Sequence, residues 1–94
     1  MVFKRNPWGD IECEDGVIIK LHRQHISYIK DAHPIGIEIE YMANENMVVY
    51  SESMEYQDTR DHRQVTPVIK EQVLKRIKDA LDFFKIDYEI DDRQ

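Results

Sequence analysis

The chain has 94 residues, of which 41% are hydrophobic and 34% are charged. This length supports one hydrophobic core, so residues 1–94 are expected to form a single domain, and the composition excludes an intrinsically disordered chain. Nineteen acidic residues against 13 lysines and arginines give a net charge of −6. Such a charge repels nucleic acid and anionic membranes and favours a basic protein partner, although it also keeps a small protein soluble.

The cysteine content and the lack of long apolar runs predict a cytoplasmic protein. Cys13 is the single cysteine, whereas a small secreted domain usually needs disulfides. No apolar run follows Lys4 and Arg5, so the N-terminus does not have the pattern of a signal peptide. No window approaches the roughly 20 apolar residues of a membrane span. We therefore expect neither a nucleic acid nor a membrane as partner.

The first strand signals follow residues 1–9, which are predicted to form an N-terminal arm. Apolar side chains recur at every second position, the period of a strand: Ile11, Cys13, Val17, Ile19 and Leu21. A two-residue turn at Asp15 and Gly16 would put glutamates on the apolar face. A three-residue loop, residues 14–16, instead pairs Cys13 with Val17 and places Gly16 in the left-handed region. The second strand is expected to continue, through a bend, into residues 26–30.

Two more strands and a helix are predicted downstream. Residues 35–41 alternate isoleucines with Gly36, Glu38 and Glu40, and residues 47–51 form the next strand. Residues 57–65 are predicted to be an exposed loop. Thr66 then caps a helix over residues 67–85, with Pro67 at its first position. Its apolar stripe consists of Ile69, Val73, Ile77, Ala80, Leu81 and Phe84.

Residues 86–91 alternate again and predict a short final strand. The fold class is therefore α+β in the order β-β-β-β-α-β. An antiparallel sheet of four to five strands packs its apolar face on the single helix in the C-terminal half. One helix covers one side of the sheet, so the other side, the open face, remains in solvent.

The open face carries the candidate functional residues. Seven carboxylates fall on the polar side of their predicted strands: Glu12, Glu14, Glu38, Glu40, Asp87, Glu89 and Asp91. If these strands are close together, the carboxylates form an acidic surface that docks a basic partner. The alternative is an ordinary solvated sheet face. Tyr56, in a less regular segment, is a candidate contact of the same interface, whereas Tyr41 and Tyr50 are assigned to the core or its rim.

Catalytic and cofactor motifs are not found in the sequence. Three glycines exclude a glycine-rich phosphate loop, and no nucleophile elbow or paired-cysteine motif is present. His22 and His25 would lie on opposite faces of a strand, and Cys13 is the only soft ligand, so no metal site or cofactor is predicted. The same histidines with Lys20 and Arg23 leave a metal-independent nuclease as a minor alternative.

The order of elements resembles a known family. An Ile26-x-Tyr28 pair precedes a glutamate-bearing strand, Val49-Tyr50-Ser51-x-Ser53-Met54 and a polar loop follow, and Thr66-Pro67 opens the helix. The chain closes with Phe84-x-Ile86-Asp87-Tyr88-Glu89-Ile90. Over residues 11–91 this resembles immunity protein 74 of bacterial polymorphic toxin systems, although that family favours a tryptophan near the place of Tyr56. The resemblance implies a non-catalytic protein that binds and neutralises a cognate, often basic, toxin domain.

Two alternatives to the immunity hypothesis are kept. The chain could be a self-associating structural or accessory subunit, a homodimer for example, that pairs through the open face or through an edge strand near Tyr56. The nuclease hypothesis requires activity that depends on His22 and His25.

Overall fold

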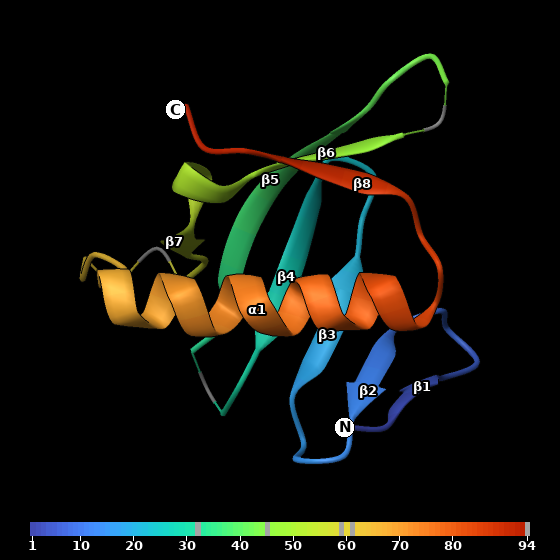
Figure 1. Ribbon diagram of the computed structural model, residues 1–94. Coiled ribbons are helices and arrows are strands. Elements are labelled where there is room, and N and C mark those ends of the chain that lie inside the picture. The colour runs from blue at the N-terminus through green and yellow to red at the C-terminus, as the bar shows by residue number, and fades with distance from the viewer. Residues whose placement is uncertain (32, 45, 59, 61, 94) are drawn as a thin grey trace.

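The computed structural model describes residues 1–31, 33–44, 46–58, 60 and 62–93. The predicted turns near residues 32 and 45, and positions 59 and 61 of the predicted loop, include residues outside this part of the chain. The described elements, shown in Figure 1, are β1 (Phe3–Arg5), β2 (Ile11–Cys13), β3 (Ile18–Leu21), β4 (His25–Ile29), β5 (Ile35–Tyr41), β6 (Met47–Tyr50), a 3₁₀ turn η1 (Ser51–Ser53), β7 (Glu55–Tyr56), α1 (Pro67–Phe83) and β8 (Tyr88–Asp91). The chain is therefore α+β, as the sequence predicts.

The strands form one mixed sheet in the order β1-β2-β3-β4-β5-β6-β8, with β7 beside the first half of β5. All neighbours described are antiparallel except β6 and β8, which are parallel because the chain crosses through α1 between them. Among the described residues the sheet has eight strands, so the expected number of four to five was too low. The predicted N-terminal arm contains β1, in which Phe3 is buried opposite Cys13.

The loop of residues 14–16 confirms the predicted hairpin. The Cys13 N–H donates to the Val17 carbonyl at 2.8 Å, and Ile11 stands opposite Ile19. Gly16 has a φ of +91°, in the left-handed region that glycine enters without a steric penalty. Apolar residues of the two strands therefore share the face that meets the helix.

The prediction that the second strand continues to residue 30 was wrong, because the chain reverses between β3 and β4. The His22 N–H donates to the His25 carbonyl at 2.9 Å, and Lys20 pairs with Ser27. The turn contains neither glycine nor proline, which hides it from a search for turn residues. The apolar positions do change from odd numbers up to Leu21 to even numbers from Ile26, which a continuous strand cannot accommodate without a bulge.

Helix α1 begins and packs as predicted. The Ile69 N–H donates to the Thr66 side chain at 3.3 Å, and Pro67 occupies the first turn. Val73, Ile77 and Leu81 are buried against the sheet. Val65, the last residue of the predicted exposed loop, is buried as well. The exposed part of this loop therefore ends at Gln64.

The helix ends at Phe83, two residues before the predicted end. Lys85 has a φ of +57°, its N–H donates to the Asp82 carbonyl, and the Ile86 N–H donates to the Leu81 carbonyl at 2.9 Å. These two bonds are those of a Schellman motif, in which the left-handed position is usually glycine. A lysine there gives no sequence signal for the end of the helix.

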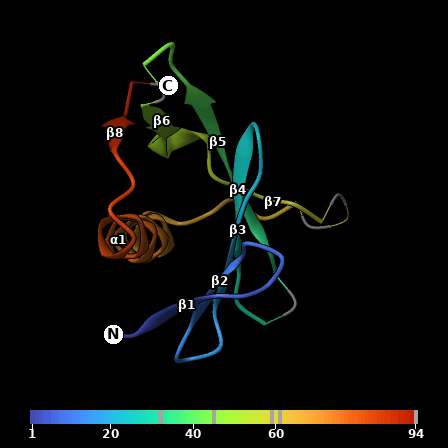
Figure 2. The same cartoon turned by 90° about the vertical axis from the view of Figure 1, so that its right-hand side faces the viewer.

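The sheet is strongly curved. Seen along the helix, β2 to β5 stand beside α1, while β6 and β8 bend over it (Figure 2). The core lies on this concave side, where buried residues of the sheet meet the buried face of α1. The convex side is the open face, and no described helix covers it (Figures 1 and 2).

Candidate protein-binding face

The open face at the end formed by β5, β6 and β8 carries most of the carboxylates. Glu38 and Glu40 alternate with the buried Ile37 and Ile39, so they point away from α1. Strand pairing places Val48 between Glu40 and Glu89. On the same side of the sheet, Tyr50 of β6 pairs with Asp91 of β8. Glu40 and Glu89, two strand spacings apart, are separated by about 10 Å at their backbones.

The electrostatics of Tyr50 show that these carboxylates converge. Desolvation of its phenol raises the pKa of Tyr50, and the negative charges of the four surrounding carboxylates raise this pKa further: Glu40, Asp91, Glu38 and Glu89. A phenol whose ionisation is opposed by four groups lies within their common field. We call the surface formed by Glu38, Glu40, Tyr50, Glu89 and Asp91 the acidic face.

The charge of the acidic face is only partly balanced. Arg93 binds Asp91 at 3.2 Å, and its hydrogen bonds lower the pKa of the Asp91 carboxyl. Among the described residues, no lysine, arginine or histidine lies within ion-pair distance of Glu38, Glu40 or Glu89. Three carboxylates on this face are therefore available to a cationic partner.

The structure separates the other predicted carboxylates from this group. Glu12 lies on β2, opposite Lys4, with β3 and β4 between it and β5. Glu14, in the hairpin loop, accepts a hydrogen bond from the Val2 N–H at 3.3 Å. Asp87 is exposed just before β8 and is not among the charges that act on Tyr50. The seven carboxylates thus form no single patch.

Tyr56 is also separate from the acidic face. It pairs with Ile35, whose side chain is buried in the core, so Tyr56 is on the helix side of the sheet and is half-buried. The Arg63 guanidinium lies 4.7 Å from its ring centre. Tyr50, which the sequence assigned to the core or its rim, is instead the aromatic residue of the acidic face. The segment 47–50 consists of Met, Val, Val and Tyr and has no polar side, so it gave no sequence signal for this placement.

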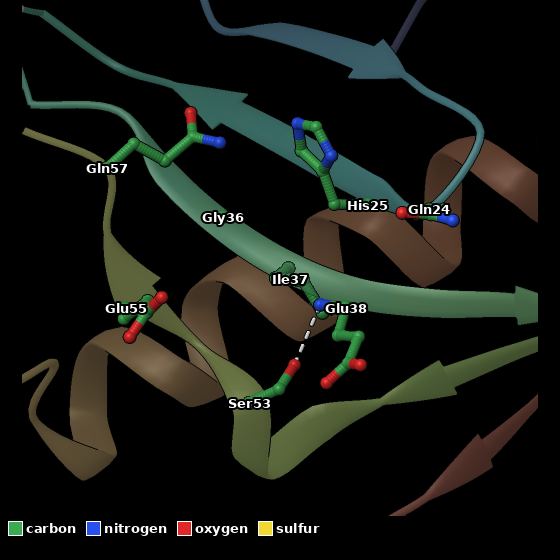
Figure 3. Close-up of a pocket in the computed structure, with 8 residues that line it drawn as sticks. All are labelled: Gln24, His25, Gly36, Ile37, Glu38, Ser53, Glu55 and Gln57. Carbon is green, nitrogen blue, oxygen red and sulfur yellow. Dashed lines mark hydrogen bonds between the residues drawn. The ribbon is translucent and has the colours of Figure 1, made fainter.

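A hollow of about 520 Å³ adjoins the acidic face around Gly36 (Figure 3). Gln24 lines it from the β3–β4 turn, His25 from the start of β4, Glu38 from β5, and Glu55 and Gln57 from β7 and the residue after it. The Ser53 hydroxyl accepts the Glu38 N–H at 2.7 Å and donates to the Tyr50 carbonyl at 2.6 Å. These bonds fix η1 against β5 and so shape one wall of the hollow, which we call the Gly36 hollow.

The two histidines of the β3–β4 turn are stacked, with ring centres 4.3 Å apart. They do not lie on opposite faces of one strand, because His22 is in the turn after β3 and His25 is the first residue of β4. Desolvation lowers the pKa of His25, and the neighbouring His22 lowers it further. No group of three histidine, cysteine or carboxylate side chains that could hold a metal ion is found in the described part of the chain.

None of the protein-family models, curated proteins or solved structures compared with the chain matches it. The resemblance to immunity protein 74 therefore stays a prediction. Within the residues that the structure describes, no helix combines the length and apolar composition needed to cross a bilayer.

Proposed function

We propose that the chain is a non-catalytic binding protein whose acidic face docks a basic surface of another protein. The observation that carries this proposal is the strand register, which places Glu38, Glu40, Glu89 and Asp91 on the same side of β5, β6 and β8 as Tyr50. Complementary potentials accelerate encounter and select against wrong partners, and a tyrosine among charged groups supplies contact area. The geometry thus offers charge and an aromatic residue on one solvent-facing surface.

The charge of the acidic face favours a basic partner over an acidic one. Two like charges on an exposed surface about 10 Å apart repel by only roughly 0.4 kcal/mol in water, and salt weakens this further. No ion pair to Glu38, Glu40 or Glu89 is formed within the described residues, although Arg23 lines a second hollow together with Glu38 and Glu40, and the charge of Glu89 acts on Arg93. A docked basic surface would relieve the repulsion and gain the opposite-charge attraction.

The proposed biological role is that of a cytoplasmic immunity protein. It follows from the resemblance in element order together with the acidic face. A toxin domain that acts on nucleic acid needs a basic surface for the phosphate backbone, and this surface is the complement of the acidic face. Binding there would block the toxin without any chemistry by the immunity protein.

The test is capture of a partner from a lysate of the source organism by the tagged protein, with two double charge reversals compared. Glu38→Lys with Glu40→Lys is expected to abolish capture of a stoichiometric basic protein. Glu12→Lys with Glu14→Lys changes the net charge equally at the other end of the sheet and is expected to retain it. The captured protein's terminal domain, expressed alone, should then be toxic and be neutralised by the wild-type chain. Equal capture by both double variants would refute docking through the acidic face.

Self-association through the open face or an edge strand is the second candidate. In the described part of the chain β1 and β8 end the sheet, and β7, which contains Tyr56, pairs with β5 on one side. Unprotected edges can pair with another copy of the chain. The mass in solution separates the candidates: a dimer whose formation the acidic-face reversals leave unchanged would support edge pairing. A monomer that captures a partner would support the immunity role.

A further inference from the structure

Two small residues, Gly36 of β5 and Ser27 of β4, lie side by side in the sheet, and Gly36 is at the base of the Gly36 hollow. Gly36 pairs with Ser27 of β4 on one side and with Glu55 of β7 on the other. A methyl group at position 36 would lie 3.0 Å from Gln57 Nε2 and 3.1 Å from Gln57 Cγ. The backbone of Gln57 is itself fixed, since its N–H donates to the Pro34 carbonyl at 2.9 Å. The Gln57 side chain therefore lies directly over Gly36, which is buried, and a glycine at position 36 leaves room for it at the base of the hollow.

The walls of the hollow present hydrogen-bond acceptors. Glu38 and Glu55 contribute carboxylates, and Gln24 and Gln57 contribute amides, each of which has an acceptor oxygen and an NH₂ donor. Burial and the adjacent His22 keep the pKa of His25 low, so its imidazole is neutral at pH 7 and one ring nitrogen can accept. None of the residues that line the hollow is a lysine or an arginine. In Figure 3 the labelled side chains surround Gly36 from both neighbouring strands.

The lining of the hollow favours a guanidinium group as its ligand over an anion, an apolar group or an ammonium. Anions are repelled by the two carboxylates, and a purely apolar group would leave the acceptors without donors. A guanidinium offers five N–H donors in a plane, binds carboxylates in bidentate fashion, and stacks on flat neutral rings such as His25. An ammonium is more strongly hydrated and cannot stack in this way.

We propose that the Gly36 hollow is a socket for an arginine side chain of the partner protein. This inference rests on the proposed function, because it specifies the anchor residue of the partner that docks on the acidic face. The Glu38 side chain lies at the border of both surfaces, so an arginine in the hollow would be continuous with the basic surface facing Glu40 and Glu89. Arginine is also among the residues most enriched at energetic centres of interfaces.

The socket can be tested without the partner, by NMR titration of the ¹⁵N-labelled protein with N-acetyl-arginine amide. Saturable shifts are expected at the Gly36 amide and the Gln57 side-chain amide. N-acetyl-citrulline amide, which has nearly the same shape without the charge, should bind at least about tenfold more weakly, a difference of about 1.4 kcal/mol. Equal shifts with citrulline, or tighter binding of N-acetyl-lysine amide, would overturn the proposal.

Two variants locate the site. Gly36→Ala adds a methyl group that pushes the Gln57 side chain without changing the charge, and it should abolish the arginine shifts. Glu55→Gln removes one carboxylate at constant shape and should weaken binding about tenfold. Glu12→Gln, at the far end of the sheet, is the matched control and should leave the affinity unchanged. Arginine affinities that are the same in Gly36→Ala, Glu55→Gln and wild type would refute the socket.

Capture of the partner protein by two variants, Gly36→Ala and the Glu38 and Glu40 reversal, distinguishes failure of the socket from failure of the proposed function. If Gly36→Ala retains the partner with wild-type affinity while the Glu38 and Glu40 reversal loses it, the acidic face stands and the socket is refuted. If both variants lose the partner while their own NMR spectra show an intact fold, both proposals are supported. If neither variant loses it, both are refuted.

Discussion

The two ends of the open face differ in how their charges are arranged. At the β1–β3 end, Lys4 stands opposite Glu12, and Lys20 Nζ lies 3.8 Å from an Asp10 carboxylate oxygen. At the β5–β6–β8 end, Glu38, Glu40 and Glu89 lie without a described cation at ion-pair distance. Strand alternation sends glutamates outward at both ends, so the alternation alone does not produce the acidic face. The neighbouring strand decides the outcome, because β1 and β3 bring lysines while β8 brings further carboxylates.

The largest expected effect is on thermal stability. It concerns the β1–β3 end of the sheet, which we call the balanced end because lysines lie beside its carboxylates; the β5–β6–β8 end is the unbalanced end. Arg76 of α1 donates two hydrogen bonds of 2.9 Å to the Asp15 carboxylate and so ties the β2–β3 loop to the helix. Arg76→Met should lower the Tm by several degrees, because a bidentate pair is lost while the aliphatic part of the side chain is kept. Lys75→Met is the matched control: it removes the exposed pair with Asp79 and should change the Tm much less.

The same pair predicts a pH dependence. Hydrogen bonds from Arg76 lower the pKa of Asp15 in the folded protein. The stabilisation is therefore fully present above the unfolded-state pKa of Asp, about 3.9, and is lost as the pH falls through the folded-state pKa. The Tm difference between wild type and Arg76→Met should shrink on acidification below about pH 4. A difference that is constant from neutral to acidic pH would contradict this role of Asp15.

A smaller effect is expected at Lys85, where the chain passes from α1 to the unbalanced end. A non-glycine residue in the left-handed region costs about 1 kcal/mol, and Lys85 has a φ of +57°. Lys85→Gly should therefore raise the free energy of unfolding by up to about 1 kcal/mol, measured by urea denaturation. Lys78→Gly, inside the helix, should lower it by a similar amount. A destabilised Lys85→Gly protein would show that the lysine side chain makes a compensating contact.

Lys85 also illustrates what the sequence could and could not provide. Thr66, Pro67 and the apolar stripe of α1 predicted the start and the buried face of the helix, because capping and periodicity are local. The reversal at His22–His25 and the end of α1 were missed, because polar residues and a lysine occupy positions where glycine is usual. For the acidic face, alternation gave the outward direction of Glu38, Glu40 and Glu89. It could not separate them from Glu12 and Glu14, since strand order is not encoded in any one segment.

The smallest expected effect is a spectroscopic one, and it measures the unbalanced end directly. The phenol pKa of Tyr50 should exceed the ordinary value of about 10, because desolvation and four carboxylates oppose its ionisation. Replacing Glu38, Glu40 and Glu89 by glutamine should lower this pKa, whereas Glu12→Gln with Glu14→Gln should leave it unchanged. Tyrosine ring ¹³C shifts followed with pH give the values, and Tyr50→Phe assigns the resonance. A basic partner bound to the acidic face should lower the same pKa, because its cations favour the phenolate. An equal response of the Tyr50 pKa to changes at both ends of the sheet would show that the carboxylates of both ends act on Tyr50. The acidic face would then not be a separate surface, which would contradict the docking proposal.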